Sequence, residues 1–318
     1  MATASPVLVV TNLDDPTADL VIDELTGRGV PVVRFDAGDF PAMLSVTARA
    51  GESRGWHGRL ETPTRIAPFE DARSLYYRRP SGFAFPHLTE QDGRFAIAQA
   101  RYGLGGVLAH LPGCLYVNHP NRIGDAEYKP AGLAVAVAVG FDVPATLITN
   151  DPAAARAFAE EHGPIVHKPL AVPHYLVDGV SCALPVTEVS PGEIDQTVAG
   201  TAHLFQARVD KVADARVTVI GERVFAVRID SGLLDWRTAD HSQLSYSVVD
   251  PPAGIEQALH AYLRRFGLVF GAFDFAIDRD TRWRWLECNP SGQWAFLEPP
   301  TCLPMTAAIA DLLERNPG

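Results

Sequence analysis

Three oxygen-bearing side chains near the C-terminal end of the chain are of the types that bind magnesium. Asp274 lies in the segment GAFDFAID, and Glu287 and Asn289 follow in RWRWLECNPSGQW. Side chains alternate across a strand, so Glu287 and Asn289 are expected on one face, about 6.6 Å apart. Convergent carboxylate and amide oxygens suit Mg²⁺ that carries nucleotide phosphates. Each residue taken alone is better explained as part of a solvated polar strand face, and only the set favours a metal site.

The pairing of the two strands decides whether these groups meet. A four-residue loop, 279–282, would pair Asp278 with Trp283 and place Asp274 directly opposite Glu287. Strict alternation then predicts that Trp283 and Trp285 share the face of Glu287.

Lysine is rare in this chain, which makes its positions informative. Of the 27 basic residues only three are lysines, Lys129, Lys168 and Lys211. Lys129 is expected at the start of a helix, and Lys168 lies in an apolar strand. Burying an unpaired ammonium costs several kcal/mol, so Lys168 must reach solvent or meet an anion. A nucleotide triphosphate is one such anion; an exposed edge strand is the alternative.

Composition narrows the class of protein. The chain has 318 residues, 47% hydrophobic residues and a formal charge of −11, which argues against a general nucleic-acid binder. No apolar run approaches the roughly 20 residues that cross a bilayer, no signal-peptide pattern is visible, and the four cysteines have no CxxC spacing. Neither a dinucleotide fingerprint nor a P-loop is present. We expect a cytoplasmic enzyme or binding protein without a membrane partner.

The elements that must position these residues follow from periodicity and from turn residues. The first part reads as strand 7–11, a helical pattern through 21–25 that Gly27 and Gly29 stop, strand 30–35, short strands within 43–68, strand 75–78, helix 90–111 and a linker at 118–121. The middle reads as helix 127–139, strand 145–149, helix 152–162, strand 164–169, a loop, and strands 184–189 and 203–209. The last part reads as a hairpin 215–229 turning at 221–222, helix 255–266, strands 268–277 and 282–289, and helix 306–315.

The order of these features resembles the ATP-grasp fold from about Asn118 to the C-terminus. The resemblance rests on Lys129, Lys168, strand 203–209 in the place of an adenine hinge, and the terminal set Asp274, Glu287 and Asn289. Further motifs extend it over nearly the whole chain: YRRP at 77–80, RVTV at 216–219, DWR at 235–237 and LECNPSGQW at 286–294. With these, the chain resembles the ATP-grasp maturases of ribosomal peptides, a group that includes the microviridin ligases and makes graspetides.

The resemblance implies an α/β (α+β ATP-grasp) fold in three parts. These are an N-terminal pre-ATP-grasp domain at 1–118, a central ATP-grasp subdomain at 119–210 and a C-terminal ATP-grasp subdomain at 211–318. It also implies ATP and Mg²⁺ as cofactors, a ribosomal precursor peptide as partner, and a homodimer. In this chemistry ATP phosphorylates an Asp or Glu side chain of the peptide. A Thr or Ser hydroxyl then closes an omega-ester, or a Lys amine closes an omega-amide.

The resemblance also implies roles for individual residues. Phosphates would be held by Lys129 and Lys168, and the nucleotide by Gln206, Ala207, Val209, Lys211 and Asp214. Magnesium would be bound by Asp274, Glu287 and Asn289. Arg228 and Arg237, with Lys168, would stabilise the transferred phosphoryl group, and Arg78, Arg79 and Arg216 would contact the peptide. The loop 170–183, with His174, Asp178 and Gly179, would form a lid over the phosphates.

Several alternatives stay open at this level. Arg228 is as readily explained by a structural pair with Asp230, and Arg78 and Arg79 by structural salt bridges. The same nucleotide site would also serve an ATP-grasp ligase acting on free amino acids or small peptides. A nucleotide-binding regulatory protein without turnover is a further alternative, although the complete metal set argues against it.

Overall fold

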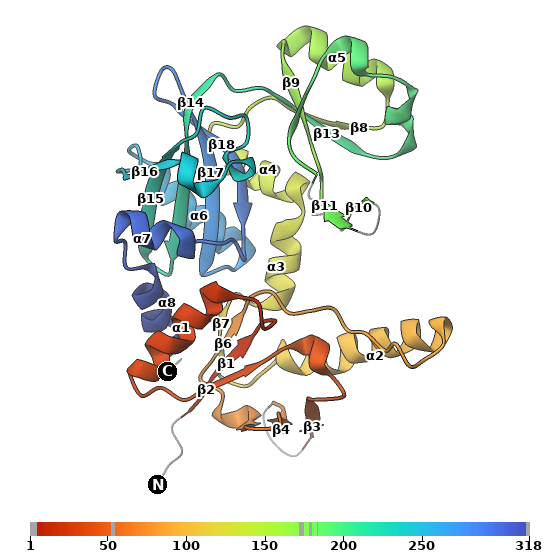
Figure 1. Cartoon of the computed structure of the whole chain (residues 1–318), viewed down its shortest axis with the longest axis vertical. Helices are drawn as coiled ribbons and strands as arrows, with labels where there is room; N and C mark the ends of the chain where they lie inside the picture. Colours follow the sequence, from red (N-terminus) through yellow and green to blue (C-terminus); the bar gives the residue numbers. More distant parts are fainter. Residues whose placement is uncertain (1–4, 52–54, 172–174, 178–179, 183, 316–318) are drawn as a thin grey trace.

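The N-terminal part of the chain forms a parallel sheet flanked by helices. We describe the protein from a computed structural model that covers residues 5–51, 55–171, 175–177, 180–182 and 184–315. Strands β1 (Val7–Val10), β2 (Val32–Phe35), β6 (Ser74–Tyr77) and β7 (Leu115–Val117) pair in the order β2-β1-β6-β7. Helices α1 (Pro16–Gly27) and α2 (Glu90–Leu108) connect them, and β3 (Ser45–Arg49), β4 (His57–Glu61) and β5 (Ile66–Pro68) form a small antiparallel sheet beneath (Figure 1).

Two helices lead from this sheet to the rest of the molecule. The expected linker at 118–121 is instead the start of α3 (Pro120–Glu127), with His119 as its N-cap, and α4 (Lys129–Ala138) follows. The single helix expected at 127–139 is therefore interrupted at Tyr128. Pro130 explains the break, because proline has no amide to donate and is tolerated only in the first turn of a helix.

The central part is a second sheet covered by one helix. Strands β8 (Thr146–Thr149), β9 (Ile165–Lys168), β12 (Thr187–Val189) and β13 (His203–Ala207) pair in the order β12-β9-β13-β8, and α5 (Pro152–His162) packs on one face. The hairpin β10 (Tyr175–Val177) and β11 (Val180–Cys182) hangs below this sheet (Figure 1). The lid residues His174, Asp178 and Gly179 lie outside the described residues.

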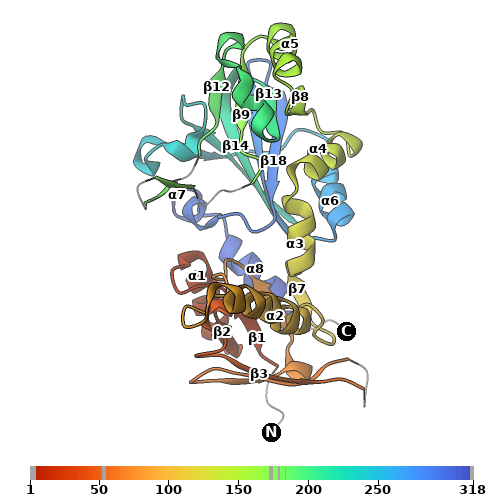
Figure 2. The same cartoon turned by 90° about the vertical axis from the view of Figure 1, so that its right-hand side faces the viewer.

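The C-terminal part is an antiparallel sheet that lies beside the central one (Figure 2). Its strands are β14 (Lys211–Ile220), β15 (Arg223–Asp230), β16 (Ser245–Val248), β17 (Phe270–Asp278) and β18 (Trp283–Asn289), in the order β16-β15-β14-β17-β18. Helix α6 (Ile255–Phe266) covers one face, where Leu259, Tyr262 and Leu263 pack against Phe273 and Phe275. The predicted hairpin turn is confirmed: Gly221 has φ +58°, a conformation that favours glycine.

Strand β18 contains a β-bulge that corrects the predicted register. Asp274 does lie opposite Glu287, but Ile277, not Asp278, pairs with Trp283, and the register shifts between Asp274 and Phe275. The extra residue is Leu286, so Trp285 and Glu287 fall on opposite faces of the sheet. Trp283 and Trp285 pack in the core under α6, away from the polar face where they were expected.

The last helices join the two ends of the chain. After α7 (Glu298–Thr301), α8 (Met305–Glu314) packs against α1, and its side chains complete a core that contains residues of β1, β14, β15 and β17. The last described helix, α8, consequently lies beside α1 (Figure 1). Within the described part of the chain, no helix combines the length and apolar character required to cross a bilayer.

Candidate functional site

The polar face of β17 and β18 brings the three predicted metal ligands together. The Asn289 amide nitrogen lies 3.3 Å from Glu287 Oε1 and 3.5 Å from Asp274 Oδ2. Asp274 is 5% exposed, and its Oδ1 atom has no hydrogen-bond partner in the described structure. The predicted set is therefore a real cluster that retains an unused carboxylate oxygen.

Cationic side chains from three other elements surround this cluster. Arg237, in a short 3₁₀ helix (Trp236–Thr238), lies 2.5 Å from Glu287 Oε1 and 3.8 Å from Asp274 Oδ2. The Lys129 ammonium, at the start of α4, lies 3.5 Å from Glu287 Oε2. Lys168, from β9, donates a 2.6 Å hydrogen bond to Gln206. The two lysines predicted to hold phosphate thus converge on the cluster, one from helix α4 and the other from strand β9.

Lys168 does not lie on an edge strand, since β9 runs between β12 and β13. Register places Lys168 opposite Leu204 and Val166 opposite Gln206, so these four side chains share the face that α5 does not cover. The edge-strand alternative for Lys168 is therefore excluded, and its ammonium points toward the carboxylate cluster.

Burial and charge shift the pKa values of these groups in opposite directions. Burial lowers the pKa of Lys168 to about 8, with Glu287 opposing the change and Lys129 adding to it. Burial by itself would raise the pKa of Glu287, but Arg237, Lys129 and Lys168 hold it well below its ordinary value. Glu287 is thus an ionised carboxylate inside a ring of cations.

The donor set fits magnesium. Mg²⁺ is usually bound in proteins by one or two carboxylates together with substrate phosphates, and Asp274 and Glu287 supply two carboxylates and Asn289 an amide oxygen. The unpartnered Asp274 Oδ1 supplies a buried acceptor that a cation would satisfy. No cluster of three or more His, Cys, Asp and Glu side chains occurs in the described residues, so this site would depend on phosphate oxygens to complete its coordination.

A cavity of about 620 Å³ opens between the central and C-terminal sheets above this cluster. All of the predicted nucleotide and metal residues line it, namely Lys129, Lys168, Gln206, Ala207, Val209, Lys211, Asp214, Asp274, Glu287 and Asn289. Its other walls are largely apolar and include Val166, Val186 and Leu286. A cavity with one apolar end and one charged end suits a flat base attached to phosphates.

The segment after β13 forms the hinge wall of this cavity. The amides of Ala207 and Arg208 donate to the carbonyls of Ala145 and Pro164, whereas the amide of Val209 makes no backbone hydrogen bond within the described part of the chain. Val209 is therefore the hinge residue whose N–H is available to a base edge. Farther along, Lys211 contacts both carboxylate oxygens of Asp214, at 2.7 and 2.6 Å.

A larger cavity of about 1,260 Å³ continues from the first toward the N-terminal domain. The three arginines predicted to contact a substrate, Arg78, Arg79 and Arg216, all line it. Lys129, Lys168, Arg237, Glu287 and Asn289 line both cavities, so the phosphate end of the first cavity is continuous with the second.

Two of these arginines are held rigidly. Arg78 is buried and pairs with Asp15 at 3.3 Å, and its Nη2 donates to Gln293 at 2.9 Å. Arg216 donates to Asp274 at 2.8 Å and to the carbonyl of Gln293 at 2.9 Å. The structural salt bridge considered for Arg78 is thus observed, and Arg78 also lines the larger cavity. Arg79, by contrast, is exposed.

The structure does not bring Arg228 to the site, which corrects that prediction. Arg228 lies opposite Ala215, whereas Arg216 lies opposite Val227 and Asp274. Because alternate residues face opposite sides of a sheet, Arg228 is on the face away from Asp274. It pairs with Asp230 at 2.7 Å, the alternative considered from sequence.

Several residues that position the site were not singled out from the sequence. Asp235 holds Arg237 through Nε at 2.9 Å, Thr146 receives a 2.9 Å hydrogen bond from Gln206, and Thr17 donates to Gln293 at 2.6 Å. Only Asp235 had a local signal, as the first residue of the DWR motif. The others act across the fold, where sequence spacing carries no information.

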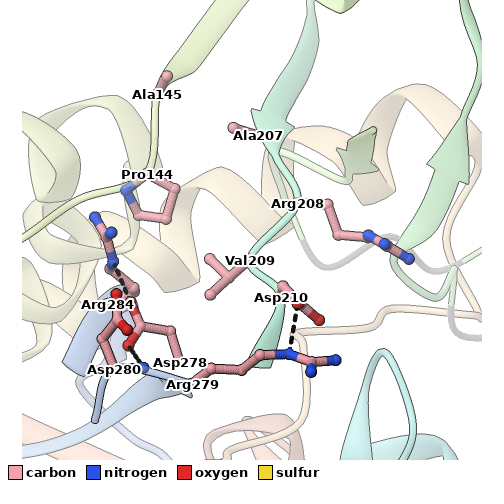
Figure 3. A pocket seen from close by; sticks show the side chains of 10 residues that line it. All are labelled: Pro144, Ala145, Ala207, Arg208, Val209, Asp210, Asp278, Arg279, Asp280 and Arg284. Carbon is pink, nitrogen blue, oxygen red and sulfur yellow. Dashed lines mark hydrogen bonds and ion pairs between the residues drawn. The ribbon is translucent and has the colours of Figure 1, made fainter. Parts of the chain in front are cut away.

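A third cavity, of about 490 Å³, lies on the other side of the hinge (Figure 3). Ala207 and Val209 line both this cavity and the cavity above the carboxylate cluster, which we call the nucleotide cavity. The charged residues at the rim of the third cavity form ion pairs. Arg279 contacts Asp210 at 2.7 Å, and Arg284 contacts Asp278 at 3.2 Å. None of the residues predicted to bind magnesium or phosphate lines it, so we assign the chemistry to the first two cavities.

Comparison with known proteins agrees with this architecture. Residues 6–123 match the family model of the MvdD pre-ATP grasp domain. A search of curated proteins found no match. Among solved structures, macrocyclase MdnC from Microcystis aeruginosa MRC, bound with precursor peptide MdnA, is 27% identical with a TM-score of 0.85, covering 97% of this chain and 99% of MdnC.

Two further structures match at similar coverage. Macrocyclase MdnB from Microcystis aeruginosa MRC is 25% identical with a TM-score of 0.82, covering 98% of this chain and 99% of MdnB. The Chryseobacterium gregarium RiPP-associated ATP-grasp ligase, in complex with ADP and a leader and core peptide, is 23% identical with a TM-score of 0.85, covering 97% and 96%. The resemblance read from the sequence motifs is confirmed: residues 6–123 form an MvdD-type pre-ATP-grasp domain, and at least 97% of the chain has the fold of the ATP-grasp ligases of ribosomal peptides.

Proposed function

We propose that this chain is an ATP-dependent peptide macrocyclase that phosphorylates Asp or Glu side chains of a ribosomal precursor peptide and closes omega-ester or omega-amide links. The observation that carries the proposal is the continuity of the two cavities through Lys129, Lys168, Arg237 and the carboxylate cluster. A nucleotide in the smaller cavity would present its γ-phosphate to a carboxylate held in the larger one. The MdnC and MdnB macrocyclases share the fold, which supports this assignment.

The chemistry requires positioning and charge stabilisation more than covalent participation by the protein. Lys129 and Lys168 would hold the phosphates, and Val209 would bind the base. Asp274, Glu287 and Asn289 would bind magnesium, which would screen phosphate charge when present. Arg237 is the cation best placed to stabilise the phosphoryl group during transfer, because it already lies between both carboxylates.

The larger cavity, which we call the peptide cavity, is lined mainly by basic residues although the whole chain carries a formal charge of −11. Its basic lining residues are Arg78, Arg79, Lys129, Lys168, Arg216 and Arg237, against two acidic ones, Glu127 and Glu287. Such a cavity would attract the acidic side chains that are to be activated, which the rest of the surface would repel. We assign the exposed Arg79 the role of meeting the peptide first.

Carboxylate activation followed by ring closure gives a direct assay. The purified chain is mixed with ATP, Mg²⁺ and each short Thr- and Asp- or Glu-rich peptide encoded beside its gene, and ADP and peptide mass are followed. We expect ADP formation that depends on peptide, loss of one water mass per ring, and loss of both on chelation of the metal. ADP formation with free amino acids alone would instead favour the rival small-molecule ligase. The homodimer implied by resemblance is checked separately by light scattering.

A further inference from the structure

One acidic side chain in the peptide cavity has no role in the chemistry above. Glu127 and Glu287 are the two carboxylates that line this cavity within the described residues, and Glu287 belongs to the magnesium cluster. Glu127 makes no hydrogen bond or ion pair with any described residue. Its solvent-accessible carboxylate lies in a cavity whose other charged lining residues are arginines and lysines, apart from Glu287.

The position of Glu127 is unfavourable for helix stability. It is the last residue of α3 (Pro120–Glu127), where the partial negative charge of the helix C-terminus repels a carboxylate. Desolvation by the surrounding protein raises its pKa. Tyr77 at the end of β6 is the neighbouring titratable group, and Arg101 of α2 acts on that same tyrosine. No contact in the described fold explains why an acid occupies this place.

Glu127 lines the same cavity as the residues proposed to act on the phosphoryl group. It is two residues before Lys129, whose ammonium lies 3.5 Å from Glu287. Both side chains border the same cavity, Lys129 at its junction with the nucleotide cavity and Glu127 on the peptide side. A carboxylate on this wall borders the space in which the peptide carboxyl phosphate would form.

We propose that Glu127 is the general base of ring closure, which binds the attacking Thr or Ser hydroxyl, or neutral Lys amine, of the peptide and accepts the one proton that the new bond displaces. The inference rests on the proposed function. It adds the residue that acts in ring closure, the step that follows phosphorylation of the peptide carboxylate. In that step the nucleophile oxygen or nitrogen forms a bond to the acyl carbon, the bond from that carbon to the phosphate oxygen breaks, and phosphate leaves with the electron pair. The nucleophile's proton passes to the Glu127 carboxylate.

Trapping with hydroxylamine separates phosphorylation of the peptide carboxylate from ring closure. Hydroxylamine attacks an acyl phosphate without help from a base and leaves a hydroxamate on the peptide. With the peptide that supports ADP formation, Glu127→Gln should form ADP and hydroxamate within about twofold of the unsubstituted chain, while ring closure falls about a hundredfold or more. Asp125→Asn makes the same charge change on the same helix at an exposed residue outside both cavities, and should close rings normally.

Each other outcome is decisive. If Glu127→Gln closes rings in normal proportion to ADP, or loses hydroxamate and rings together, Glu127 does not act on the nucleophile. If Glu127→Gln fails to fold, Glu127→Asp supplies the test, with hydroxamate expected unchanged and ring closure reduced about tenfold because the carboxylate is set back by one methylene. Should the unsubstituted chain form neither ADP nor hydroxamate with any such peptide, the proposed function itself fails, a result that differs from every one above.

Discussion

At the scale of single residues, the charge of Glu287 is the centre of the site. Three cations converge on this half-buried carboxylate, and Arg237 contacts it at 2.5 Å. An ion pair enclosed in this way is costly to break on one side only, because the partner charge remains without compensation. The arrangement keeps Lys129, Lys168 and Arg237 gathered before a nucleotide binds.

Glu287→Gln removes the negative charge while keeping the shape of the side chain. We expect peptide-dependent ADP formation to fall at least a hundredfold, since a metal ligand and the partner of Arg237 are lost together. Nucleotide affinity without magnesium should be retained or increase, because a negative charge beside the phosphates is gone. Glu222→Gln, in the exposed β14–β15 turn, serves as control. Unchanged ADP formation would show that the magnesium assignment is wrong.

The lowered pKa of Lys168 predicts a pH dependence with a definite sign. The ordinary lysine pKa is 10.5, and burial lowers that of Lys168 to about 8. Between these values the unfolded chain binds the additional proton, so the contribution of Lys168 to the free energy of unfolding rises with pH. A triphosphate favours the charged ammonium, so nucleotide affinity should be full below pH 8 and decrease as pH rises through it, by at most about tenfold per unit.

Calorimetric titration of nucleotide on both sides of pH 8 tests this expectation. Lys168→Arg provides the comparison, because the guanidinium stays charged and its binding should lose this pH dependence. A similar decline in both proteins would assign the effect to another group.

At the scale of elements, the bulge at Leu286 determines which side chains reach the site. Without it, strict alternation would turn Glu287 toward the core that holds Trp285 and Phe275. One additional residue in β18 thus permits an aromatic core and a metal cluster on the same short strand.

Deletion of Leu286 should abolish ADP formation and destabilise the chain, because an ionised carboxylate would be forced into apolar surroundings. Leu286→Ala is the matched control, since it keeps the extra residue and hence the face of Glu287. We expect the alanine variant to keep its thermal transition within a few degrees and to retain activity above that of the deletion. Equal activity in the two variants would contradict this interpretation of the bulge.

The turn after β18 depends on glycine at position 292. A Cβ there would lie 2.6 Å from Ala272 Cβ and 2.7 Å from Arg216 Nη2. Gly292→Ala should therefore cost about 1–3 kcal/mol of stability and displace Arg216 from Asp274. Chemical denaturation measures the first effect and the KM for peptide the second. Gly192→Ala, where a Cβ would meet nothing within 4 Å, should change neither.

At the scale of the whole molecule, the first and last segments of the chain share a core. Val7, Val9 and Leu25 from the N-terminal part pack in one cluster with Phe270, Ile309 and Leu313 from the C-terminal part. The central sheet instead has its own small core with Ala155, Ile165 and Phe205. The peptide cavity is therefore bordered on one side by parts that share one core and on the other by a separately packed sheet.

Ile309→Ala should reveal this coupling. Ile309 is fully buried, and its truncation should cost about 2–5 kcal/mol. Hydrogen exchange should accelerate in β1 and β14 alike, because both strands depend on the shared core. The matched substitution Ile194→Ala, in the central core, should accelerate exchange mainly in β8, β9 and β13. Acceleration confined to α8 in the first variant would mean that the two ends unfold independently. The two boundaries between the three domains drawn from sequence remain predictions that this experiment also examines.

The sequence by itself determined the elements with strong local signals and the chemical types at the site. Helices 152–162 and 255–266 begin and end where capping residues and glycine predict, since those signals act within a few residues. Lys168 was identified because an ammonium on an apolar strand needs an anionic partner, and Lys129 because lysine is rare in this chain. Asp274, Glu287 and Asn289 were identified as oxygen donors of the types that bind magnesium.

Only the tertiary structure decided which faces these groups occupy. A bulge reverses every later side chain in a strand, and whether one forms depends on packing that neighbouring residues do not encode. The bulge made the prediction for Trp285 wrong. The register of β15 against β14 placed Arg228 on the far face, and the packing of α3 placed Glu127 in the cavity. Register and element packing are long-range properties, whereas residue type and turn chemistry are local.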